Sequence, residues 1–137
     1  MDNPLKQLGR AFTGGVVGLL VGFAFTAAID IAGVIAFPPP EGFEPTNIDA
    51  VLELNAARPL QTYLPLIIGW FSGTYIGAWL AGRISQVFWP FPGWIVVIFL
   101  FTAGLATMFS FPHPLWVWGL GILAFAAGGW MGTDAGK

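Results

Sequence analysis

The chain alternates between long apolar stretches and short segments rich in proline or charge. The apolar stretches cover about residues 11–37, 60–82, 93–111 and 115–132, and Asp30 is the only charged residue within them. A run of roughly 18 or more apolar residues with almost no charge is long enough to cross the hydrocarbon core of a membrane as a helix. The pattern therefore predicts an all-α membrane protein, a four-transmembrane-helix bundle that forms a single integral membrane domain.

One sizeable loop, residues 38–59, interrupts this pattern after the first stretch. It opens with three consecutive prolines, which lack a backbone donor and favour an extended path, so the first helix must end there. Further along, Thr46 is a candidate helix cap, and apolar residues recur at helical spacing from Ile48 to Leu54. We expect a short interfacial helix in this first outer loop.

The lysines and arginines near the ends of the stretches predict an orientation, because positive residues collect on the cytoplasmic side. An even number of spans places both termini on one side of the membrane. That side carries Lys6, Arg10, Arg83 and Lys137, and the other side carries Arg58 alone. We therefore expect an integral protein of the bacterial cytoplasmic (inner) membrane, with N- and C-termini cytoplasmic.

Composition agrees with this and narrows the chemistry. Hydrophobic residues make up 56% of the chain and charged residues 9%, whereas a soluble domain carries roughly 25% charged residues. The net charge of −2 argues against nucleic acid as a partner. Cysteine is absent, which excludes disulfides and thiolate metal sites. We expect no cofactor and no metal, and the expected partners are the lipid bilayer and other transmembrane helices.

Small residues recur at every fourth position in three of the stretches. Helices in lipid associate through close backbone approach, which small side chains permit. These stripes are therefore candidate helix-packing or partner interfaces. They either pack helices within one bundle or, for one of the stripes, dock another chain, and both alternatives stay open. The glycines concerned are Gly14, Gly18, Gly22, Gly69, Gly73, Gly77, Gly128 and Gly132.

Asp30 is the one ionisable residue well inside a predicted span, seven residues before Phe37. An acid near the bilayer centre costs about 2.5–3.5 kcal/mol on insertion scales, and less toward the interface. One interpretation pairs Asp30 with Arg58 near the outer headgroups. The other is a buried carboxylate that carries a proton or binds a cation.

His113 is the only histidine and stands between Pro112 and Pro114, where the chain reverses between the last two spans. It is either a structural turn residue or a pH-sensing or proton-relay group that works with Asp30. Asp30, His113 and Arg58 are thus the candidate ionisable functional residues. The sequence contains no catalytic motif such as GxSxG, HExxH or a P-loop, so no catalytic residue is assigned.

Three blocks in order resemble a known pattern. They are FPPP at residues 37–40, the stretch from Gly69-Trp70 to Arg83-Ile84, and PHPLW at residues 112–116. Together they resemble a family of small bacterial four-transmembrane-helix proteins with PPP and PHPLW motifs, over nearly the whole chain. The resemblance implies four spans and a functional outward face, and it carries over no activity.

Our leading hypothesis is a small non-enzymatic integral membrane protein that acts as a structural or accessory subunit of a larger assembly or homo-oligomer. The alternative is a homodimeric proton- or cation-coupled small transporter or channel that uses Asp30. A third hypothesis is an enzyme acting on lipid at the outer leaflet through Asp30, Glu41 or His113.

Overall fold

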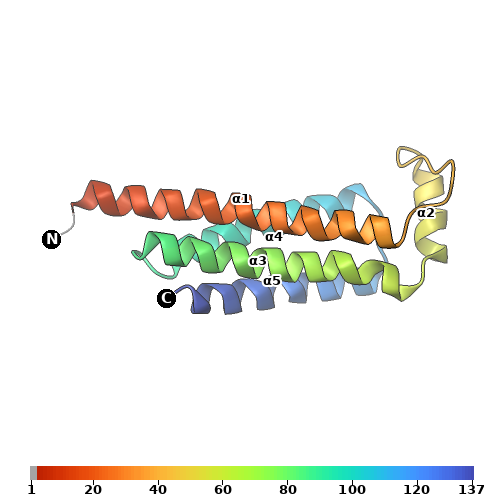
Figure 1. Cartoon of the computed structure of the whole chain (residues 1–137). Helices are drawn as coiled ribbons and strands as arrows, with labels where there is room; N and C mark the ends of the chain where they lie inside the picture. Colours follow the sequence, from red (N-terminus) through yellow and green to blue (C-terminus); the bar gives the residue numbers. More distant parts are fainter. Residues whose placement is uncertain (1–2) are drawn as a thin grey trace.

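The structure, a computed structural model, describes residues 3–137 and is helical throughout this range apart from its connecting loops (Figure 1). Four of the helices are long and apolar enough to cross a membrane, so the chain is an integral membrane protein. This confirms the prediction of an all-α protein with four long apolar helices. The elements are α1 (Pro4–Ala36), α2 (Ile48–Ala57), the 3₁₀-helix η1 (Leu60–Tyr63), α3 (Leu64–Ser85), α4 (Phe91–Ser110) and α5 (Leu115–Ala135).

Helix α1 begins well before the apolar stretch that predicted it. The side chain of Asn3 caps it by accepting a hydrogen bond from the backbone N–H of Leu5 at 3.0 Å, and Pro4 fits the first turn because its missing N–H would be unpaired there anyway. Its 33 residues span about 50 Å, which exceeds the roughly 30 Å hydrocarbon core. The N-terminal end of α1 consequently projects beyond the ends of α3 and α5 (Figure 1).

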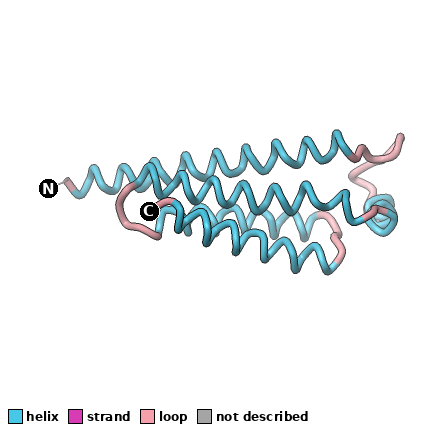
Figure 2. Tube along the Cα trace, turned by 60° about the horizontal axis from the view of Figure 1, so that its bottom comes forward, coloured by secondary structure: helices cyan, strands magenta, loops and turns pink. Residues whose placement is uncertain are grey.

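The loop of residues 38–59 contains a helix, α2, which Asn47 caps in place of Thr46. The Asn47 side chain accepts from the N–H groups of Asp49 and Ala50 at 3.1 and 3.3 Å. Helix α2 lies across one end of the bundle, and both chain termini lie at the opposite end (Figures 1 and 2). The loop and the termini are therefore separated by the full length of the spans.

Helix α3 is central and packs against α1, α4 and α5. Along the α1–α3 contact the two backbones touch through glycine. A Cβ atom added to Gly22 would lie 2.9 Å from the carbonyl oxygen of Gly73, and one added to Gly77 would lie 2.8 Å from that of Gly18. These distances leave no room for a side chain. We call this contact, from Gly14 to Gly33 on α1, the α1–α3 seam.

A second seam joins α3 to α5, which runs parallel to it. Gly128 and Gly132 of α5 lie directly against the backbone carbonyls of Phe71 and Tyr75. All eight glycines predicted as packing or partner positions thus lie in one of these two seams. The eight glycines therefore lie at contacts between helices of this chain.

The α1–α3 seam generates a test with a neighbouring control. In the Gly14→Ala variant the new Cβ would lie 2.6 Å from the carbonyl oxygen of Ala81, a backbone atom that cannot move alone. We expect the free energy of unfolding, measured by SDS titration with circular dichroism, to fall by about 1–3 kcal/mol.

Gly15→Ala is the matched control, because nothing lies within 4 Å of a Cβ at that position. Alanine in an open helical site is favoured over glycine by about 0.5–1 kcal/mol, so this variant should be unchanged or slightly more stable. Equal stability of the two variants would contradict the seam.

Candidate functional site

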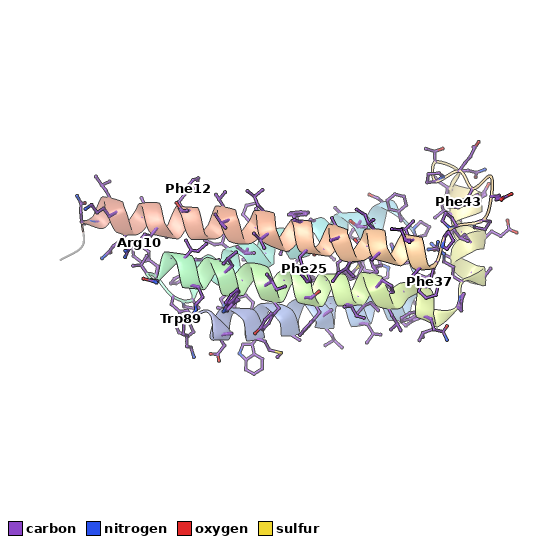
Figure 3. The ribbon with its side chains drawn as sticks, viewed as in Figure 1. Arg10, Phe12, Phe25, Phe37, Phe43 and Trp89 are labelled. Atoms are coloured by element: carbon purple, nitrogen blue, oxygen red, sulfur yellow. The ribbon has the colours of Figure 1, made fainter. Side chains whose placement is uncertain are left out.

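A pocket of about 250 Å³ lies where the bundle meets α2. Phe37 marks this end in Figure 3, opposite the end that carries Arg10 and Trp89. The lining comes from α1, α2, η1, α3 and the turn before α5, so segments far apart in sequence meet here. Its members are Asp30, Gly33, Val34, Phe37, Asn55, Arg58, Thr62, Tyr63, Pro65, Leu66 and His113.

Asp30 reaches this pocket because it continues the α1–α3 seam. Counting on from Gly22 in steps of four gives Thr26 and then Asp30, so both face α3 and not lipid. The Thr26 hydroxyl lies between two carbonyl oxygens, 3.0 Å from that of Gly22 and 3.1 Å from that of Gly69, and can donate to either. The seam therefore turns polar one turn before the pocket begins.

One oxygen of the Asp30 carboxylate lacks a hydrogen-bond donor. Its Oδ1 atom is buried and has no hydrogen-bond partner in the part of the chain that the structure describes. Burying an acceptor without a partner is costly, and more so when it belongs to a charged group. This buried oxygen lies against α3, 3.3 Å from the position of a Cβ added to Gly69, while the residue as a whole lines the pocket.

Arg58 is the pocket's cation. It caps the C-terminus of α2, where its backbone N–H donates to the carbonyl oxygen of Leu54 at 3.0 Å, and it is half-buried. The ion pair with Asp30 that one interpretation of the sequence expects is not formed among residues 3–137. The two charges line one pocket without neutralising each other.

A hydrogen-bond network fixes the roof of the pocket. Tyr63 is only 4% exposed, and its hydroxyl lies 3.1 Å from the backbone oxygen of Asn55 and 3.2 Å from Asn55 Oδ1. The Asn55 amide in turn donates to the carbonyl oxygen of Pro112. Because Asn55 is in α2, Tyr63 in η1 and Pro112 in the turn before α5, this network clamps α2 onto the bundle.

His113 belongs to the same wall. Its Nδ1 atom hydrogen-bonds the carbonyl oxygen of Phe111, and its ring meets that of Tyr63 edge-on with centroids 6.5 Å apart. A carbonyl only accepts, so this hydrogen bond requires a proton on Nδ1. The Pro-His-Pro turn therefore supplies a pocket side chain that its own backbone holds in place.

Asp30, Arg58 and His113 all line one pocket, whereas the sequence interpretations paired Asp30 with Arg58 or with His113 but could not place them within reach. It adds Asn55 and Tyr63, which sequence reasoning missed. The available signal was the four-residue step that carries the glycine stripe of α1 on to Asp30. The residues described do not group three or more His, Asp or Glu side chains at metal-binding spacing. The polar groups of the pocket can form hydrogen bonds and ion pairs.

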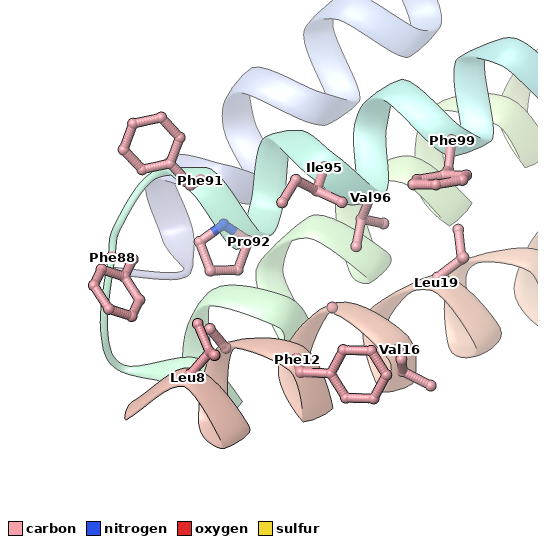
Figure 4. A pocket seen from close by; sticks show the side chains of 12 residues that line it. Leu8, Phe12, Val16, Leu19, Phe88, Phe91, Pro92, Ile95, Val96 and Phe99 are labelled. Atoms are coloured by element: carbon pink, nitrogen blue, oxygen red, sulfur yellow. The ribbon is translucent and has the colours of Figure 1, made fainter. Parts of the chain in front are cut away.

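A second cavity, of about 760 Å³, lies toward the end of the bundle that carries the termini (Figure 4). It is a groove between the first half of α1 and the start of α4, and we call it the α1–α4 groove. Every side chain in it is apolar. The lining is Leu8, Ala11, Phe12, Gly15, Val16, Leu19, Phe88, Phe91, Pro92, Ile95, Val96 and Phe99.

Comparisons with family models, with curated proteins and with solved structures found no match to this chain.

The clamp on α2 can be tested through Asn55→Ala. This variant removes the hydrogen bond to Pro112, worth about 1 kcal/mol, while the Tyr63 hydroxyl keeps the backbone oxygen of residue 55 as its acceptor. Local opening of α2 should become more frequent, so the amides of residues 48–58 should exchange about 5-fold faster in hydrogen–deuterium exchange. Glu53→Ala shortens an exposed side chain of the same helix and serves as the control. Indistinguishable exchange in the two variants would show that the network does not hold α2.

Proposed function

We propose that this protein is a small non-enzymatic integral membrane protein that works as an accessory subunit of a larger assembly or as a homo-oligomer. The observation that carries the proposal is the one-sided burial of α1. Only 6% of its most apolar window is buried, against 33–39% for the other three spans. Helix α1 contacts α3 and α4 along one side and presents the rest of its apolar surface outward.

The α1–α4 groove is the proposed place of contact, and its occupant is a transmembrane helix of another subunit. Ala11 and Gly15 line it four residues apart, and nothing lies within 4 Å of a Cβ at Gly15. Small residues at this spacing let a second helix approach closely, a feature that a lipid chain does not require. This pair is distinct from the glycines of the two seams, which the chain itself covers.

The proposed setting is the bacterial cytoplasmic membrane with both termini in the cytoplasm. Its support is that Lys6, Arg10, Arg83 and Lys137 belong to the end opposite α2, while Arg58 is the one basic residue at the α2 end. In this orientation α2 lies at the outer membrane interface and the pocket opens outward. Membership of the four-span family with PPP and PHPLW motifs stays a prediction from those motifs.

Filling the groove tests the subunit proposal. We expect the wild-type protein, released in native lipid particles, to have a mass above that of one 14.7 kDa chain by native mass spectrometry. Gly15→Leu should reduce the particle to a single chain, because the leucine occupies the space of the incoming helix.

Gly119→Leu is the control, since a Cβ at Gly119 also meets nothing within 4 Å but lies on α5, away from the groove. A wild-type particle of one chain contradicts the proposal, with or without bound phospholipid. So does an unchanged mass for Gly15→Leu.

A second candidate function is a homodimeric proton- or cation-coupled transporter or channel. Its support is the pocket that gathers Asp30, Arg58 and His113. The tight glycine contacts of the α1–α3 seam leave no route from Asp30 along that seam to the other end, so a pathway needs a second copy.

Flux measurements test this candidate. With purified protein in liposomes, Asp30→Asn should lower proton or cation flux to the protein-free background, because the amide neither carries a proton nor attracts a cation. Glu53→Gln removes one carboxylate from the same end of the molecule and should leave flux unchanged. Wild-type flux in Asp30→Asn would eliminate this candidate.

A further inference from the structure

The pocket at the α2 end holds more acceptors than it can satisfy from within. The Tyr63 hydroxyl proton is directed to Asn55, which leaves the phenolic oxygen able to accept. The Asp30 carboxylate and the His113 ring line the same pocket, and Asp30 forms no ion pair among residues 3–137. These three groups line one pocket of about 250 Å³. A group with several N–H donors and a positive charge fits them best.

Arg58, in contrast, can bind an anionic group. Its guanidinium offers five N–H donors in a fixed planar fork, which matches a phosphate or carboxylate. It has no ion pair among residues 3–137 and lies at the edge of the pocket formed by α2. One pocket thus presents an acceptor set around Asp30 and a cation that is free to bind an anion.

We propose that this pocket binds a zwitterion, with a primary ammonium on Asp30 and an anionic group on Arg58. The volume of about 250 Å³ is below the roughly 300–1,000 Å³ of pockets for drug-sized ligands, so the bound part is small. The proposal does not depend on the subunit role.

Two sources supply this chemistry. One is the headgroup of an aminoethyl phospholipid. Val34 and Phe37, both pocket residues at the end of α1, have exposed side chains against which lipid tails can lie. The other is a soluble zwitterion of the same type, such as glycerophosphoethanolamine.

The experiment measures binding in the absence of any ion gradient, so its outcome is separate from that of the flux assay. The purified protein in neutral detergent is titrated with three phospholipids that share their acyl chains. These are phosphatidylethanolamine, phosphatidylcholine, whose trimethylated nitrogen has no N–H, and phosphatidylglycerol, which has no cation. Bound lipid is counted by native mass spectrometry. Glycerophosphoethanolamine is titrated separately by calorimetry.

We expect phosphatidylethanolamine to bind at least 10-fold more tightly than either of the other lipids. Asp30→Asn and Arg58→Gln should each weaken binding about 10- to 100-fold, the range for one hydrogen bond to a charged group. Glu53→Gln should have no effect, because Glu53 is exposed on α2 and does not line the pocket. Tight binding of glycerophosphoethanolamine assigns the site to a soluble zwitterion, and binding of the lipid alone assigns it to a headgroup.

Equal affinity for the three lipids together with no binding of glycerophosphoethanolamine overturns the proposal. Unchanged affinity in Asp30→Asn also overturns it. Misfolding is controlled for by thermal unfolding without ligand. Since Asp30→Asn removes an unsatisfied buried charge, its melting temperature should be equal to or above that of the wild type. The ligand-induced rise in melting temperature should be lost in this variant and kept in Glu53→Gln.

Discussion

The fold depends on direct backbone contact between α3 and its two neighbours. Apolar side chains cannot hold helices together in lipid, because the surrounding tails are equally apolar. Association must come from van der Waals contact and interhelical hydrogen bonds, both of which strengthen as backbones approach. Gly22 packs against Gly73, and Gly132 packs against Tyr75. These contacts bring α1 and α5 so close to α3 that no side chain would fit between the backbones. Helix α3 is central because it offers a glycine face to α1 and a carbonyl face to α5.

The same constraint places the ionisable site. The glycine stripe of α1 continues in steps of four through Thr26 to Asp30. The face of α1 that packs against α3 therefore also carries the carboxylate. Gly69 provides the space, since a Cβ there would lie 3.3 Å from Asp30 Oδ1. Just beyond, Gly33 packs on the Pro65 ring and α1 ends. The pocket therefore forms where the seam ends and α2 closes over it.

Periodicity and length were enough to predict four long apolar helices and a short helix between residues 38 and 59, because these depend on local pattern. The start of α1 was missed because Lys6 and Arg10 precede the apolar stretch and mark its first boundary, whereas the helix already includes both residues. Sequence reasoning suggested that Asp30 works with Arg58 or with His113, but it could not show that the three line one pocket, because that depends on how α2 folds back. The position of α2 depends on the hydrogen bonds of Asn55 with Tyr63 and Pro112. Both of these residues are far from Asp30 in the sequence.

The two cavities lie toward opposite ends of the bundle and differ completely in chemistry. Helix α1 lines both, with Asp30 in the polar pocket and Gly15 in the apolar groove. Between them the α1–α3 seam is packed backbone to backbone at its glycines, and it contains the Thr26 hydroxyl, which can donate to either of two carbonyl oxygens. Apart from that hydroxyl, a change at one cavity reaches the other along the seam only if α1 tilts or slides as a rigid body. Carbonyl contacts such as Gly77 on Gly18 resist such motion, so the structure favours two ends that work independently.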